Sequence, residues 1–517
     1  MSAEGCIQLL EKQLINKDII IANKDKQLLA EQSKVVYLQE QLQLARAQRF
    51  GRSSEQYVIP NQLSLFDEGS EVITSEEEIE VPAHTRKSNR GKRKPLPEGL
   101  ERVRIEYKLD AVDLIGPDGE QYIKIGESIS EQLDIVPAEV RVLQHVRFKY
   151  AVKGKEELGV KTAPIANQAI PKSIASSGLL AHIAQAKYCH HLPLYRQEMI
   201  WRSLDVFIPR NSMCRWMLDL GEKCTPIVEE LLEQIKSQKH LHVDETTVTV
   251  INDNNKKEGK PSHNGYMWVY TNDEAVVYDY QSSREGIHPF VKLDDFHGYI
   301  QTDAYAGYKQ LFKEGERISV GCWAHARRKF TDVLKSLSKK RKNTHADSII
   351  KMIGKLYKIE KYCLENQLIY DEKKRYRLEK SKPILDKIKK YLAELQPKTP
   401  PQGLLGNAIS YTLNNWVQLT NYLKDGCIPI DNNPAERKIR PFTIGRKNWM
   451  FCGNTKGAEA SANLYSMIES AKLYNLKIFE YLKFVFENII AAKSAKDFEE
   501  LTPKYAHIYL PTIKVKS

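Results

Sequence analysis

The sequence predicts a multidomain α/β protein, and three observations lead to this class. An apolar heptad repeat opens the chain, a central stretch passes from β-rich runs to alternating strands and helices, and a lysine-rich helical stretch interrupts it. Three successive strands followed by strand and helix in turn are typical of a mixed sheet covered by helices. At about 100–200 residues per domain, 517 residues suffice for about three to five folding units.

Composition narrows the classes of protein. Lys and Arg number 78 against 66 Asp and Glu, and the net charge of +12 favours an anionic partner, nucleic acid first. The sequence has no run of about 18 uncharged apolar residues and no secretory h-region, so we expect no membrane contact and a cytoplasmic location. Eight scattered cysteines without a C-x-x-C pair argue against a disulfide framework and a cysteine-rich zinc finger.

Residues 1–50 are predicted to form a coiled-coil helix. An apolar residue recurs every seven positions, and neither glycine nor proline interrupts the repeat. Such a pattern leaves an apolar seam that a second copy of the helix can cover. We therefore expect a homo-oligomer formed through this segment, with packing of the helix on its own chain as the alternative. The repeating positions are Ile7, Leu14, Ile21, Leu28, Val35 and Leu42.

Residues 51–102 are predicted to be a charged linker with a basic arm. A glutamate-rich block precedes six cations in the nine positions 86–94, among them Lys92, Arg93 and Lys94. Blocks of like charge are usually solvated. Beside a dimerising helix, a basic arm can also lie along a DNA backbone and release counterions, so these three cations are candidate DNA-binding residues.

Two smaller units are expected next. Residues 103–165 alternate in short apolar runs separated by glycine turns, which predicts a small β unit. Residues 166–237 are helical in pattern. Within them, 194–220 is a candidate helix-turn-helix with Arg215 and Trp216 on its second helix, although two short helices joined by a turn are more often plain packing.

The chemistry is expected in the mixed sheet of residues 238–330. Asp244 lies in a strand-like run among valines, and Asp303 ends an apolar run before a glycine-containing turn. Carboxylates on neighbouring strands repel each other unless a cation lies between them, and oxygen ligands favour Mg²⁺ or Mn²⁺. Glu436, at the start of a later helix, would complete a two-metal site for phosphoryl transfer. Taken singly, each of these acids is more often an ordinary surface carboxylate.

Two acids compete for the third ligand position. Asp431 precedes Asn432, Asn433 and Pro434, so it falls in a loop or at a cap, where its expected task is to accept backbone N–H groups. Glu436 falls in the first turn of the helix, for which Pro434 is suited. We therefore expect Glu436 to be the ligand and Asp431 to support the helix start.

Nine motifs are spread along nearly the whole chain. They are RFGRSSEQ at 49–56, ESISEQLDIVPAEVRVLQHVRFKY at 127–150, HLPLYRQ at 191–197, HVDET, QTDAYAGY, GCWAHARRKF, DNNPAER, GRKNWMF, and SMIESAKLYNL at 466–476. In this order they together resemble the DDE transposases of the insertion-sequence-66 family.

The resemblance implies an RNase H-like catalytic core that is split by a helical insertion and followed by C-terminal helices. It also implies that Asp244, Asp303 and Glu436 form the metal-binding triad. The corresponding ranges are 238–330 plus 426–455 for the core, 331–425 for the insertion and 456–517 for the C-terminal helices.

Relatives in this family usually carry two cysteine pairs around the small β unit, which form a zinc-binding module. Here the corresponding places have the sequences LIGPDGEQ and KYAVKGKE, and neither contains a cysteine. We therefore expect Mg²⁺ or Mn²⁺ as the cofactor and no zinc.

Basic residues near the acids form a second set of candidates. Cys322 and His325 make a metal-like pair, but a closed zinc site needs four ligands, so a buried cysteine and a structural histidine are favoured. The cations after Glu436 usually form a solvated face; beside three carboxylates, a track for the DNA backbone is the preferred interpretation. The candidate DNA contacts are His325, Arg327, Arg328, Arg437, Arg440, Arg446 and Lys447.

The leading hypothesis is a DNA transposase of the bacterial cytosol or nucleoid. It would cleave a strand at the ends of its element and transfer that strand into target DNA, and proteins of the same element are candidate accessory partners. An RNase H-fold nuclease or resolvase that does not join strands is the first alternative, and a non-catalytic DNA-binding repressor is the second. The heptad helix and the basic arm favour a machine that pairs two DNA ends.

Overall fold

The computed structural model describes residues 168–252, 262–303, 305–312, 317–337 and 344–513, together with 102–106, 130, 132, 139–150, 160–164 and parts of 17–46. By its internal contacts the chain divides into two units. One consists of residues 55–145, and the other of residues 1–54 and 146–517. The sheet and the helices described next belong to the larger unit.

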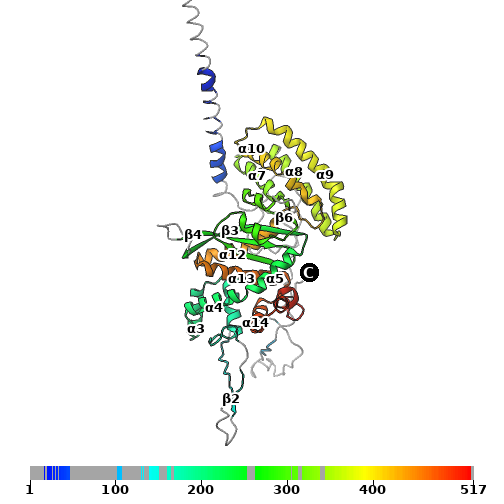
Figure 1. Cartoon of the computed structure of the whole chain (residues 1–517). Helices are drawn as coiled ribbons and strands as arrows, with labels where there is room; N and C mark the ends of the chain where they lie inside the picture. The colour runs from blue at the N-terminus through cyan, green and yellow to red at the C-terminus, as the bar shows by residue number, and fades with distance from the viewer. Residues whose placement is uncertain are drawn as a thin grey trace, which may run out of the picture. The chain divides into compact units, whose positions relative to one another are not determined.

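A six-stranded mixed sheet lies at the centre of this unit (Figure 1). Its strands are β3 (His240–Asn252), β4 (His263–Thr271), β5 (Val276–Gln281), β6 (Gly298–Gln301), β7 (Arg317–Val320) and β8 (Cys452–Asn454). Their order is β5-β4-β3-β6-β7, and β8 pairs with the far end of β3. The pairs β5–β4 and β4–β3 are antiparallel, whereas β3, β6 and β7 are parallel. The predicted mixed sheet is therefore confirmed.

Helix α13 (Thr455–Leu473) covers the edge strand β5. The hydroxyl oxygens of Ser466 and Ser470 accept the backbone N–H groups of Tyr278 at 2.8 Å and Val276 at 2.9 Å. An open strand edge would otherwise expose these donors to pairing with another chain. Two serines spaced by four on one helix face thus close this edge of the sheet.

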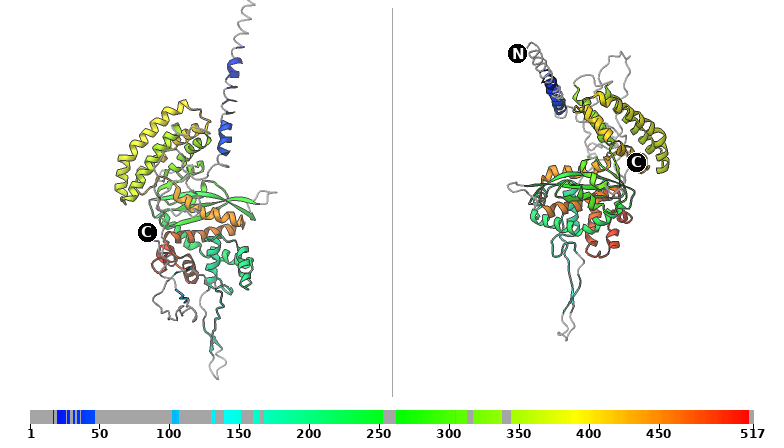
Figure 2. Two further views of the ribbon diagram at one scale, coloured as in Figure 1. Left: turned by 180° about the vertical axis from the view of Figure 1, so that it is seen from behind. Right: turned by 45° about the horizontal axis from the view of Figure 1, so that its top comes forward.

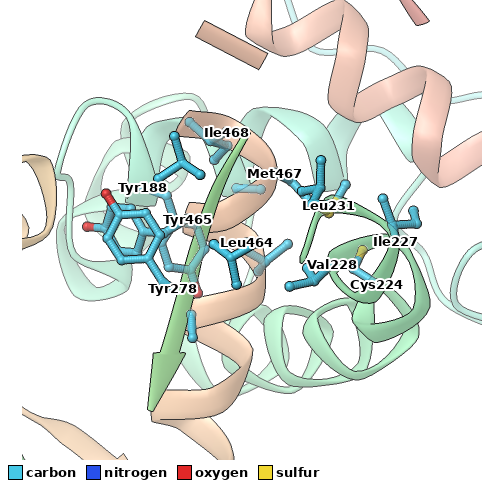
Figure 3. Packing of buried hydrophobic residues seen from close by; sticks show 14 of the residues in the cluster. Tyr188, Cys224, Ile227, Val228, Leu231, Tyr278, Leu464, Tyr465, Met467 and Ile468 are labelled. Atoms are coloured by element: carbon cyan, nitrogen blue, oxygen red, sulfur yellow. The ribbon is translucent and has the colours of Figure 1, made fainter. Parts of the chain in front are cut away.

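The main hydrophobic core lies between the sheet and the helices on this side. Tyr465 packs against Tyr188 and Tyr278, with ring centroids 5.1 Å and 5.6 Å apart (Figure 3). The surrounding helices are α2 (Ser177–Tyr188), α3 (Leu194–Ser203), α4 (Arg210–Lys223), α5 (Thr225–Lys236), α14 (Ile478–Asn488), α15 (Ala495–Glu500) and α16 (Pro503–Ala506).

The connections of the sheet position the candidate site. They are α6 (Ile287–Lys292) and the 3₁₀ helix η2 (Ala306–Phe312) on either side of β6, α7 (Trp323–Ser336) after β7, and α12 (Asn433–Trp449) before β8. Helix α12 runs along β3 and β4. The sequence predicted the strand-to-helix step into α7 and the helix start near Pro434, and both are present.

A helical layer follows α7 and lies on the side of the sheet away from α13 (Figures 1 and 2). It consists of α8 (His345–Glu365), α9 (Tyr370–Leu395), α10 (Leu404–Asn414) and α11 (Trp416–Thr420), and it has its own hydrophobic core. The described part of the predicted insertion at 331–425 consists of helices joined by short turns, but position 331 falls inside α7, which continues to Ser336. The hydrophobic periodicity of the sequence does not show where that helix ends and the insertion begins.

A buried ion pair connects the insertion to the segment that leads into α12. The fully buried Arg377 donates to Glu360 at 2.6 and 2.7 Å. Its guanidinium also donates to the carbonyl oxygens of Tyr422, Asp425 and Ile428 at 2.8 to 3.0 Å. The buried guanidinium is therefore paired with a carboxylate and hydrogen-bonded to three carbonyl groups, as a buried charge requires.

Every described residue between positions 17 and 46 is helical. The heptad residues Ile21, Leu28, Val35 and Leu42 are 50–59% exposed, so this chain alone does not cover the predicted seam. Near the C-terminal end of this helical segment, Glu40 accepts the backbone N–H of Leu404 at 2.9 Å. Self-association through residues 1–50 stays a prediction.

Two other predictions fall wholly or partly outside the described residues. The linker with Lys92, Arg93 and Lys94 is outside them except for residue 102. Of the β unit at 103–165, one antiparallel pair is described, β1 (Lys149–Tyr150) with β2 (Lys161–Thr162). Residues 194–220 do contain two helices, α3 and α4, separated by a short turn. Across the described part of the chain, none of the helices has the length and apolarity needed to span a bilayer.

Candidate active site

Asp244 lies on the face of β3 that α12 covers. Two residues on the same face contact the two ends of that helix. His242 Nδ1 lies 2.7 Å from Oδ1 of Asn432, and Arg446 donates to the hydroxyl of Thr246 at 3.1 Å. Because alternate residues of a strand share a face, Asp244 lies between these contacts and faces the helix.

The electrostatic surroundings of Asp244 disfavour its negative charge. Burial is the main cause that raises the pKa of this carboxyl to about 8, and the charges of Glu245, Asp303 and Glu436 raise the pKa further. The backbone N–H of Glu245, which donates to Oδ1 at 2.9 Å, opposes this effect. Asp303 and Glu436 therefore lie close enough to act on Asp244, and a cation or a proton would relieve this repulsion.

Asp303 follows β6. Because β6 pairs in parallel with β3, the C-terminal end of β6 lies beside Asp244. The side chain of Asp303 accepts the backbone N–H of Tyr305 at 2.9 Å, which fixes the turn before η2. From α10, the hydroxyl of Tyr411 donates to the Asp303 carbonyl at 3.2 Å. The helical insertion therefore supports the backbone of one candidate ligand.

Glu436 lies in the first turn of α12, as the sequence predicts. Its two carboxylate oxygens lie 3.5 Å from His325 Nε2 and 3.5 Å from an Arg328 Nη atom, both on α7. Burial first, and then the positive charge of Arg328, lowers the pKa of His325, so the imidazole is neutral at neutral pH. Oε1 of Glu436 is buried without a hydrogen-bond partner.

Asp431, the competing acid, has different surroundings. It is 7% exposed, and its oxygens accept the Tyr357 hydroxyl at 2.9 Å and the backbone and side-chain N–H groups of Asn433 at 3.1 and 2.9 Å. These bonds occupy both carboxylate oxygens. Asp431 therefore anchors the start of α12 to α8, whereas Glu436 keeps an oxygen available.

The predicted basic contacts are distributed over α7 and α12. Arg437, Arg440 and Lys447 are exposed along α12. Arg446 instead donates to the hydroxyl groups of Thr246 and Thr247, so it holds α12 on β3. Cys322 is buried before α7 and accepts a backbone N–H at its sulfur, which agrees with the structural interpretation of that residue.

One acid of the site was missed at the sequence level. Glu245 directly follows Asp244, and its carboxylate accepts Arg284 at 2.5 and 2.6 Å and the hydroxyl of Tyr308. The Arg284 guanidinium in turn stacks 3.7 Å from the ring centroid of Tyr305. This cluster fastens the turn after Asp303 to β3, and the adjacent acid in the HVDET motif was the available signal.

In the described residues no three histidine, cysteine, aspartate or glutamate side chains already stand together as a formed metal site. The donor chemistry nevertheless suits a hard divalent cation. Asp244 is destabilised as an isolated anion, and Glu436 has a buried oxygen without a hydrogen-bond partner. Oxygen ligands of this kind are those that Mg²⁺ and Mn²⁺ take in proteins.

A mixed sheet that places half-buried acids beside two arginine-bearing helices suits a polyanionic substrate. Comparison with known proteins gives the family. The model described as "Transposase IS66 family" matches residues 172–460, more than half of the chain, so the chain belongs to the IS66 transposase family. The model of "Transposase C of IS166 homeodomain" matches residues 37–105.

Similar proteins come from Sinorhizobium fredii (strain NBRC 101917 / NGR234). The uncharacterised protein y4jD is 33% identical over 396 residues, covering 74% of this chain and 75% of its own. The uncharacterised proteins y4qI and y4hP are 30% and 26% identical, each covering 89% of this chain and 87% and 86% of their own lengths.

The prediction that the chain holds no zinc is wrong. A model described as "zinc-finger binding domain of transposase IS66" matches residues 118–151. The prediction relied on the missing cysteines alone, whereas the similarity extends over the whole segment.

Proposed function

We propose that this chain is an active DNA transposase that cleaves a strand at the ends of its element and joins that strand to target DNA. The observation that carries the proposal is the arrangement of Asp244, Asp303 and Glu436. Asp244 lies on β3, Asp303 follows the parallel strand β6 and Glu436 lies on the covering helix, and the charges of the latter two act on Asp244. Membership of the IS66 transposase family supports the same reaction class.

The catalytic core is proposed to be RNase H-like. Three antiparallel strands (β3, β4 and β5) are followed by two strands parallel to β3, with acids on β3 and after β6. The third acid arrives on a helix that follows the insertion. This order supports the proposal because it brings acids from distant parts of the sequence to one end of the sheet.

Asp244, Asp303 and Glu436 would hold two divalent cations, Mg²⁺ or Mn²⁺. When bound, these ions supply activation of the attacking oxygen and stabilisation of the leaving oxygen. Glu436 offers its buried free oxygen, and Asp244 is relieved of repulsion. The cluster of Glu245 and Arg284 holds the Asp303 turn in place while the carboxylates approach each other.

DNA is proposed to lie across α7 and α12. Arg328, beside Glu436, offers a planar fork that suits a phosphate close to the acids. Arg437, Arg440 and Lys447 would contact the backbone farther along α12, which positions the strand without reading its sequence. A neutral His325 next to Glu436 is able to donate a hydrogen bond to a phosphate oxygen without competing for the carboxylate as a full charge.

A strand-transfer assay tests the proposal. The protein is incubated with Mg²⁺, labelled DNA carrying the ends of its own element, and a plasmid target. We expect joined product, and none from Asp244→Asn. Hydrolysis without joining would indicate a nuclease or resolvase, and binding without cleavage would indicate a repressor; either result would overturn the proposal. Asp279→Asn, on β5 and paired with Lys292, is the matched control that should keep activity.

A further inference from the structure

A single buried asparagine connects the elements that carry the candidate site. Asn432, which is 0% exposed, immediately precedes α12. Its side-chain oxygen lies 2.7 Å from His242 Nδ1, and its side-chain nitrogen donates to the carbonyl of Val243 at 3.2 Å. Its backbone N–H donates to the Cys322 sulfur at 3.2 Å. All polar groups of this side chain are therefore engaged.

Each partner lies next to a candidate catalytic residue. His242 and Val243 directly precede Asp244 on β3, and Cys322 immediately precedes α7, which presents His325 and Arg328. The Asn432 carbonyl accepts the backbone N–H of Glu436 at 3.2 Å, which begins the helical turn that carries that acid. Residues about 110 to 190 positions apart in sequence thus meet at one amide.

An amide side chain is the group that this junction requires. The Val243 carbonyl needs a donor, and the oxygen of Asn432 then faces His242, whose Nδ1 must carry the proton. An aspartate would lack the donor and would bury a charge, and an alanine would leave the Val243 carbonyl and His242 Nδ1 buried without these partners. The contacts are specific enough to define the distance between β3 and the start of α12.

We propose that Asn432 is a positioning residue that holds Glu436 at a fixed place relative to Asp244. This inference rests on the proposed function and assigns a structural task to His242 and Cys322 as well. Residues that orient metal ligands typically change metal affinity or activity by about 10- to 100-fold when they are removed. The effect of removing Asn432 should accordingly appear in the requirement for Mg²⁺ and not in DNA affinity, since the side chain is inaccessible to DNA.

Asn432→Ala in the full chain tests the proposal, with Asn463→Ala as the matched control. Asn463 lies on α13, away from the acids, and its amide also makes two hydrogen bonds, to the Gly221 carbonyl and the Thr225 hydroxyl. Three quantities are measured for each variant: the Mg²⁺ concentration that gives half of the maximal thermal stabilisation, the rate of strand cleavage at saturating Mg²⁺, and the affinity for DNA.

We expect Asn432→Ala to need about 10-fold more Mg²⁺ or to cleave about 10- to 100-fold more slowly, with DNA affinity unchanged. Asn463→Ala should lose stability without either change. His242→Phe keeps a ring of similar size and breaks the same contact, so it carries the test if Asn432→Ala fails to fold. Because the two changes remove one interaction, the double variant should be no worse than the poorer single variant.

Equal Mg²⁺ requirements and equal cleavage rates in His242→Phe, Asn463→Ala and the wild type would overturn the positioning role. Failure of the proposed function would look different. In that case the wild type itself would show neither Mg²⁺-dependent stabilisation nor cleavage, whereas a failed positioning role leaves the wild type active.

Discussion

Replacing Asp244 by asparagine should stabilise the metal-free protein. The carboxyl is buried beside other acids, and its pKa of about 8 in the folded protein lies well above the ordinary value of 3.8. Between these two values the folded protein keeps the proton that the unfolded chain has released. The contribution of this carboxyl to stability is therefore largest below pH 3.8 and is lost as the pH rises to 8. An asparagine has no charge to bury and still accepts the Glu245 N–H.

The magnitude follows from the same values. pH 7 lies 3.2 units above the ordinary pKa of 3.8, so the buried carboxyl destabilises the folded state by about 4 kcal/mol at 1.36 kcal/mol per unit. Asp303 and Glu436 share this repulsion, so we expect a gain of about 2–4 kcal/mol. For a domain of this size about 2 °C accompanies each kcal/mol, which gives a rise in Tm of about 4–8 °C.

Thermal unfolding at pH 7 in EDTA, and again with Mg²⁺, measures both consequences. The wild type should gain stability on adding Mg²⁺, and Asp244→Asn should gain little because it lacks the anion that attracts the ion. Asp279→Asn serves as the control, since it removes an ion pair with Lys292 and should leave Tm unchanged or slightly lower. A lower Tm for Asp244→Asn than for the wild type in EDTA would refute the reasoning.

Three further outcomes are expected. In the cleavage assay, Glu436→Gln should abolish product while circular dichroism shows an intact fold. Asp431→Asn should keep measurable activity, because the oxygens of Asp431 serve structural hydrogen bonds. The reverse result would assign the third ligand position to Asp431. Deleting residues 1–50 should lower the oligomeric state measured by light scattering, and an unchanged oligomeric state would show that the helix packs on its own chain. Arg377→Met should lower the free energy of unfolding by about 3–5 kcal/mol in a denaturant titration, because Glu360 loses the fully buried guanidinium and keeps only the more exposed Lys373 at 3.4 Å.

Local pattern determined the elements of the catalytic region. The alternation of Val243, Val248 and Val250 with polar residues is that of a strand, and the Asn-Pro step before Glu436 is that of a helix start. Both elements are present as β3 and α12. Such features depend on neighbours a few positions apart, which is why the sequence suffices to predict them.

The sequence also directed attention to Asp244, Asp303 and Glu436, chiefly through the resemblance of whole motifs to one family. Apart from that resemblance, it ranked Asp431 below Glu436 only by their places in the helix start. Tyr357, which holds Asp431, lies 74 positions earlier on α8. Contacts over such separations have no local periodicity and arise only when the sheet and the insertion have packed.

What the sequence determined by itself was therefore the order of strands and helices, the basic and acidic segments, and the family motifs. The tertiary structure decided which polar groups meet: Glu245 with Arg284, Asn432 with His242, and Arg446 with Thr246. The physical reason is that secondary structure follows from interactions between near neighbours, whereas a buried polar group takes its partner from whichever distant segment the packed core brings within hydrogen-bonding distance.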